Sequence, residues 1–148
     1  MSLLIDVADA VVAELNAGSF SQPFTATRRY DPRRPLKELS TLRVDVVPSQ
    51  PSMETTPTAR DDVFQNDVSV DVAVRKKFSE GDFDELDPLM DLIEEITEHF
   101  QKGWLSELPH AVLQGIEVVA VADAEYMQTK RVFFGLLTLT VRVHTTPD

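Results

Sequence analysis

The clearest pattern in the chain is an alternation of apolar and polar residues between positions 63 and 78. Because successive side chains of a strand point to opposite faces of its sheet, this pattern predicts a long strand with one buried and one wet face. The apolar parity holds Phe64, Val68, Val70, Val72, Val74 and Phe78, and the polar parity holds Gln65, Asp67, Ser69, Asp71, Arg75 and Lys77.

Weaker versions of the same pattern predict four more strands, over 25–30, 42–47, 115–122 and 131–144. In the last of these, five apolar residues from Phe133 to Val143 fall on one face, whereas Thr138, Thr140 and Arg142 fall on the other. The secondary structure of residues 104–113 is ambiguous from the sequence pattern. Residues 49–62 are rich in serine and threonine and contain two prolines, so we expect a long loop or arm there.

Two stretches have helical spacing instead. Over 3–15, apolar residues recur every three or four positions, Ser2 can cap the start, and Asp9 and Glu14 lie off the apolar stripe. Over 84–102 a second apolar stripe runs from Leu86 to Phe100. The element order is then α-β-β-β-α-β-β. We expect a two-layer α+β fold, with about five mostly antiparallel strands and both helices on one face.

Length and composition bound the classes of protein to consider. The 148 residues favour a single domain over 1–148, and the 43% apolar content is enough for a core. The net charge of −11 counts against a non-specific nucleic-acid binder and against docking on an anionic membrane. There is no cysteine, which excludes disulfides, thiolate metal sites and cysteine nucleophiles. The N-terminus lacks signal-peptide character and no apolar run is long enough to span a bilayer, so we expect a soluble protein.

Known catalytic and cofactor motifs are absent from the sequence. We therefore expect no catalytic, cofactor-binding or metal-binding residues and no cofactor. One alternative is a small metal-binding enzyme that uses Asp91, Glu95 and His99, since Glu95 and His99 are one helical turn apart. The more ordinary interpretation of this group is a solvated helix face.

Charge is unevenly distributed along the chain. Residues 28–43 carry a net +4, and residues 80–98 contain nine acids and no lysine or arginine. The basic stretch predicts a contact surface for an acidic protein neighbour in preference to nucleic acid, because aromatic residues for base stacking are scarce. Opposite patches suit head-to-tail contacts in a ring, and pairing within one molecule is the alternative. The basic residues are Arg28, Arg29, Arg33, Arg34, Lys37 and Arg43, and the acids are Glu80, Asp82, Asp84, Glu85, Asp87, Asp91, Glu94, Glu95 and Glu98.

Several segments together resemble a known family. The chain opens with a helix (VADAVVAELN), a strand (FSQPFTATR-Y) and a second strand (L--L-V-VVP). It continues with DVSVDVAVRKKF, DELDPLMDLIEEITEHF and FFGLLTLTVRV. This arrangement resembles the tail terminator, or tail completion, proteins of long-tailed bacteriophages. The resemblance covers nearly the whole chain, is weakest over 104–130, and rests on packing residues.

The resemblance implies a structural, non-enzymatic virion protein of the tail and neck, assembled in the host cytoplasm. Such proteins form a homo-oligomeric ring, typically a hexamer, which caps the head-proximal end of the tail tube. Its partners would be itself, the tail tube protein and the head–tail connector protein. DNA would only pass through the ring, and no membrane would be involved. An alternative is another neck component, such as a head completion or head–tail joining protein.

We expect three contact surfaces on this basis. The first is the basic stretch, and the second is the arm, with Met53, Glu54 and Arg60. The third is the acidic stretch, some of whose carboxylates would line a channel and repel passing DNA.

Overall fold

The computed structural model describes residues 2–31, 34–60, 62–79, 83–120 and 131–146. Its elements are α1 (Leu3–Ala17), β1 (Ala26–Arg28), the short 3-10 helix η1 (Leu36–Ser40), β2 (Arg43–Pro57), β3 (Phe64–Lys77), α2 (Phe83–Phe100), β4 (Trp104–Leu105), β5 (Leu108–Ala120) and β6 (Val132–Thr145). They form one sheet in the order β1-β2-β3-β6-β5-β4. β1 pairs parallel with β2, and every other pair is antiparallel.

The predicted α+β class and the two main helices are confirmed, but the sheet differs from the expectation. It has six strands instead of about five, and it is mixed. The additional strand, β4, is only two residues long, which is too short to produce a periodic signal in the sequence. β1 runs parallel to β2 because the connection through η1 returns the chain to the same end of the sheet before β2 begins.

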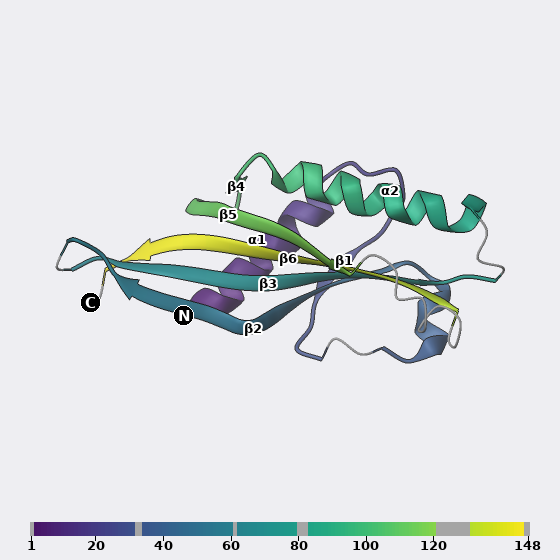
Figure 1. The fold of residues 1–148 in the computed structure, drawn as a ribbon, viewed down its shortest axis with the longest axis horizontal. Helices are drawn as coiled ribbons and strands as arrows, with labels where there is room; N and C mark the ends of the chain where they lie inside the picture. The colour runs from purple at the N-terminus through teal and green to yellow at the C-terminus, as the bar shows by residue number, and fades with distance from the viewer. Residues whose placement is uncertain (1, 32–33, 61, 80–82, 121–130, 147–148) are drawn as a thin grey trace.

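The core lies between one face of the sheet and the two helices. β3 and β6 pair over their whole length, from Phe64 opposite Thr145 to Lys77 opposite Val132. The valines of β3 and the leucines of β6 that share a parity, such as Val72 and Leu137, are fully buried. In Figure 1, α1 crosses the sheet at a steep angle and α2 runs nearly along the strands on the β5 side.

Gly135 of β6 allows α2 to approach the sheet closely. A Cβ at this position would lie 2.5 Å from Cδ1 of Ile93, a buried residue of α2. The start of α1 is capped as expected, because the Ser2 hydroxyl accepts a hydrogen bond from the Ile5 amide at 3.4 Å. Gly103 follows α2 with a φ of 89°, the left-handed conformation that suits glycine at a helix end.

The predicted loop over 49–62 is wrong for most of its length. β2 continues to Pro57, with an irregularity between Pro48 and Met53, and then pairs again with β3 up to Phe64. The prolines are tolerated because β1 pairs only with Val44 to Val46, which leaves the rest of β2 at the sheet edge. Figure 1 shows this β2–β3 hairpin projecting beyond both helices. From here on, the arm means the end of this hairpin, residues 53–60 together with 62–66.

Candidate functional site

The acids of α2 divide into two groups. Glu95 accepts hydrogen bonds from the amide (2.8 Å) and the hydroxyl of Ser21, and Glu85 accepts from the amide and hydroxyl of Ser79, both at 3.0 Å. The other carboxylates point outward and form no ion pair within the described part of the chain. These exposed residues, which we call the α2 acidic surface, are Asp84, Asp87, Asp91, Glu94 and Glu98. Glu80 and Asp82 lie outside the described residues.

A groove of about 310 Å³ lies between α2 and β5. Met90 and Val118, which are 40% and 41% exposed, line it together with Thr97. Glu94 and Glu98 of the α2 acidic surface also line it. The α2–β5 groove therefore combines apolar and anionic side chains.

Exposed apolar side chains gather at the same edge of the sheet. Four of the eight large hydrophobic residues that are exposed in the described part of the chain belong to β4 or β5, and Met90 of α2 lines the groove beside β5. The four are Trp104, Val112, Val118 and Val119. A cluster of this kind with a polar margin is typical of a surface that contacts another protein. This surface is not predictable from the sequence, because the 104–113 region lacks a regular period.

The opposite edge of the sheet carries a cationic patch beside an exposed aromatic residue. Tyr30 follows β1 and is 70% exposed. Nη1 of Arg28 donates a hydrogen bond to the Tyr30 hydroxyl at 2.8 Å, and the guanidinium lies 5.4 Å from the ring centroid. Nε of Arg28 also pairs with Asp9 at 2.8 Å. We call Arg28, Arg29 and Tyr30 the β1 edge patch.

Other cations of the basic stretch are occupied within the chain. Arg34 forms a bidentate ion pair with Asp45, at 2.6 and 2.7 Å, and the Arg34 side chain is only 8% exposed. The hydrogen bonds that Arg34 donates to the Asp45 carboxylate raise the pKa of Arg34 above its usual value. Nε of Arg43 donates to the Glu38 carbonyl at 3.0 Å, whereas Lys37 is exposed. Arg33 lies outside the described residues, so the predicted basic surface is smaller than its sequence indicates.

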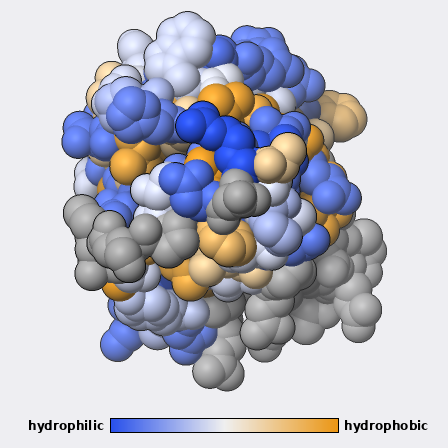
Figure 2. Space-filling view, turned by 90° about the vertical axis from the view of Figure 1, so that its left-hand side faces the viewer, coloured by the Kyte–Doolittle hydropathy of each residue, from blue (hydrophilic) through white to orange (hydrophobic). Residues whose placement is uncertain are grey.

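The arm presents all three of its predicted contact residues to solvent, since Met53, Glu54 and Arg60 are exposed. It is held by Asn66, which is buried and whose amide donates to the Val143 carbonyl at 3.1 Å and to the Thr145 hydroxyl at 2.8 Å. Figure 2 views the molecule from the end at which the arm projects, and polar side chains cover most of that face, with apolar patches between them.

Glu14 is the polar residue whose environment differs most from the sequence prediction. It was expected on the wet face of its helix, but it is 4% exposed and lies between α1, α2 and the segment after β4. It accepts hydrogen bonds from Lys102 Nζ at 2.7 Å and the Ser106 amide at 2.6 Å, and it contacts His99 Nε2 at 3.0 Å. Burial raises its pKa, but these hydrogen bonds outweigh burial and lower it to about 2. We call this group the Glu14 clamp.

The contacts of the Glu14 clamp also test the alternative of a metal site formed by Asp91, Glu95 and His99. His99 contacts Glu14 of the other helix, and Glu95 is bonded to Ser21, so the structure does not join them with Asp91. Across the described ranges, no three histidine, aspartate or glutamate side chains are placed to hold a metal ion.

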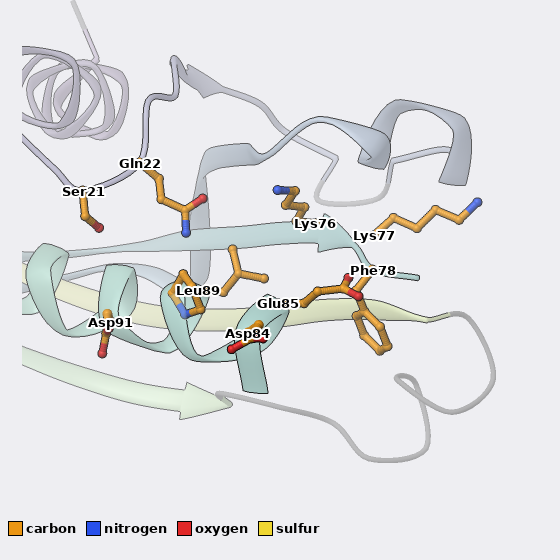
Figure 3. Close-up of a pocket in the computed structure, with 10 residues that line it drawn as sticks. Ser21, Gln22, Lys76, Lys77, Phe78, Asp84, Glu85, Leu89 and Asp91 are labelled. Atoms are coloured by element: carbon orange, nitrogen blue, oxygen red, sulfur yellow. The ribbon is translucent and has the colours of Figure 1, made fainter. Parts of the chain in front are cut away.

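A cleft of about 410 Å³ lies where the end of β3 meets the start of α2. Lys76 and Lys77 line one side, and Asp84 and Asp91 line the other. Figure 3 shows the lysine chains extending away from these carboxylates. Side chains of both charges therefore line the cleft, but the lysines and carboxylates do not converge. This arrangement does not suit acid–base chemistry.

Comparisons with known proteins find a likeness to solved structures. No family model and no curated protein matches the sequence. A solved structure with a similar chain path is titled "Cryo-EM Structure of an Extracellular Contractile Injection System, PVC sheath/tube terminator in extended state". Its identity to this chain is 15% and the TM-score is 0.49, over 99% of this chain and 58% of that one. This chain therefore corresponds to less than two thirds of that protein. Among the described helices, none is long and apolar enough to cross a membrane.

Proposed function

We propose that this protein is the structural subunit of a ring that caps the head-proximal end of a phage tail tube, stops its polymerisation and joins it to the head connector. The observation that carries the proposal is the separation of contact chemistry between the two edges of one sheet. The α2–β5 groove, apolar and anionic, lies at one edge, and the β1 edge patch, cationic and aromatic, lies at the other. The resemblance of the sequence to tail terminators supports the same role.

Two different, complementary patches on one subunit favour head-to-tail contacts between copies. Such heterologous contacts generate a closed ring if the rotation between neighbours closes, and a filament if it does not. A terminator must be finite, so we propose the closed form, a hexamer. Opposite charges on the two patches would also select the correct register between neighbours.

The arm is our candidate for the contact with the tube or the connector. Residues 53–57 are exposed on both parities of the strand, so neither face of the hairpin end is covered within the described part of the chain. A paired, projecting hairpin keeps its shape while both its faces remain available to a partner. Met53 supplies an apolar contact, and Arg60 supplies a charge.

The α2 acidic surface has a second role in this proposal. Glu94 and Glu98 border the groove, whereas Asp84, Asp87 and Asp91 lie nearer the start of the helix. We assign the three aspartates to the wall of the channel, where like charge would keep passing DNA from adhering. Replacing these three aspartates with lysine should slow DNA ejection from assembled particles. Normal ejection would remove this part of the proposal.

A tube-length assay tests the proposed function. The cognate tube protein would be polymerised with and without this protein, and tube lengths would be measured by electron microscopy. We expect wild type to give shorter tubes with a ring at one end. A variant with Met53→Ser and Arg60→Ser in the arm should bind tubes less well while keeping its fold, and Glu107→Ser, another exposed site, serves as the matched control. Tubes of unchanged length and without end-bound protein would refute the proposal.

A further inference from the structure

We propose that Tyr30 of one copy, held by Arg28, inserts into the α2–β5 groove of the next copy. This contact rests on the proposed function only in that copies meet head to tail. It names the residues that join one subunit to its neighbour.

The inserting side is already organised for binding. Tyr30 exposes 70% of its surface, and an aromatic side chain of this size gains from being covered. The hydrogen bond and the ring contact from Arg28 restrict its conformations before any partner arrives. Less side-chain freedom is then lost on association. Tyrosine and arginine are also the residue types that most often dominate interface energies.

The receiving side has matching shape and charge. The groove of about 310 Å³ has room for an aromatic ring, and Met90 at its wall has a flexible side chain that can adapt to one. Val118 offers an apolar contact on the β5 side. Glu94 and Glu98, which line the groove, form no ion pair with described residues, so they can meet Arg28 and Arg29, which precede Tyr30.

The sheet order places these two surfaces on different edges. β1 is at one end of the order, and β5 with the short β4 is at the other, so a subunit cannot fill its own groove with its own Tyr30. Trp104 beside Lys102 is also an exposed aromatic next to a cation, but it lies on the same edge as the groove. A second copy that presents Tyr30 is therefore the occupant that the distribution of charge favours.

Site-specific cross-linking tests this contact directly, because the chain has no cysteine. Asp31→Cys, at an exposed site next to Tyr30, and Val118→Cys would be combined in one chain and treated with a short bis-maleimide, so that Tyr30 itself stays in place. We expect a ladder of covalent oligomers, and a mixture of the two single variants should give dimers that contain one chain of each. The matched control pairs Asp31→Cys with Glu107→Cys, an exposed site in the turn between β4 and β5.

The expected enrichment over the control pair is on the order of a hundredfold at ~10 µM protein, because residues held in contact have an effective concentration near millimolar. Cross-linking no greater than that of the control pair would overturn the proposal. Circular dichroism of each variant shows whether it has folded.

Charge exchange provides a second test without cysteines. One variant carries Glu94→Arg and Glu98→Arg, and the other carries Arg28→Glu and Arg29→Glu. Each alone should be monomeric, because its two contact surfaces then have the same sign. Mixed in equal amounts, they should assemble again, since each surface now meets its opposite on the other variant. A mixture that stays monomeric, or single variants that assemble as wild type does, would overturn the contact.

These results separate the contact from the proposed function. Specific cross-links from a protein that does not shorten tubes would support the contact and refute the terminator role. Shortened tubes without specific cross-links would support the role and refute this contact.

Discussion

Replacing Glu14 with glutamine tests the Glu14 clamp, which joins the two helices and the segment after β4. The carboxylate is nearly inaccessible to solvent and is bonded to Lys102 and the Ser106 amide. Glutamine has the same shape without the charge, so it imitates the protonated acid. We expect the variant to fold and to have a lower free energy of unfolding than wild type at neutral pH.

The size of the loss follows from the pKa of Glu14. That pKa is about 2 in the folded protein, against an ordinary value of 4.5. A lowered folded-state pKa means that the stabilisation is fully present above pH 4.5 and is lost as the pH falls towards 2. This difference in pKa corresponds to a stabilisation of the folded state by about 3 kcal/mol at pH 7 and by about half of that at pH 3.

Urea unfolding of wild type and Glu14→Gln at both pH values measures these differences. At each pH we take the difference in the free energy of unfolding between wild type and Glu14→Gln. The contribution of the other carboxylates cancels in this difference, because they titrate in both proteins. Glu94→Gln is the matched control, because Glu94 is exposed on α2 and should change the free energy of unfolding little. A gap between wild type and Glu14→Gln that is the same at pH 7 and pH 3, or absent at both, would refute this account of the clamp.

Three further substitutions test other parts of the structure. Asp45→Asn removes the buried carboxylate that pairs with Arg34 and leaves the guanidinium with only the partly exposed Glu38, at 3.2 Å, so it should lower the free energy of unfolding by about 3 kcal/mol in chemical denaturation; a loss below about 1 kcal/mol would contradict the buried pair. Gly135→Ala forces a methyl group against α2 and should cost about 1–3 kcal/mol, whereas Gly115→Ala, with no atom near its Cβ, should not; equal thermal midpoints would contradict the packing. Asn66→Ala should speed amide hydrogen exchange in the arm and leave the helices unchanged, and unchanged exchange in the arm would show that Asn66 does not hold it.

Periodic segments could be predicted well from the sequence, because each periodicity reports directly on burial. The alternation through β3 and the helical spacing of α2 both predict the correct element, and most of the buried residues lie on the apolar side. The exceptions are Ala73 and Arg75 of β3, which are buried on the parity expected to be wet. The arm is predicted as a contact surface, but its strand structure is not, because Pro48 predicts the end of the strand and the prolines within 49–62 predict a loop. A proline ends a central strand but not an edge strand, and a single sequence does not show which strand lies at the edge.

The contact surfaces were only partly predictable, because they depend on long-range neighbours. Arg34 counted as a surface cation until the fold placed Asp45 beside it. Glu14 became a buried acid because Lys102 and Ser106, far along the chain, pack against α1. The groove forms where α2 packs beside β5, and no local pattern in either segment predicts that contact.

Single-particle electron microscopy of the purified protein tests the central claim most directly. The account predicts closed rings, six copies in each, in which the β1 edge of every subunit lies against the α2–β5 groove of the next. Rings joined through other surfaces would contradict the proposed contact. Monomers, or symmetric dimers that bury the same patch on both copies, would contradict the head-to-tail assembly itself.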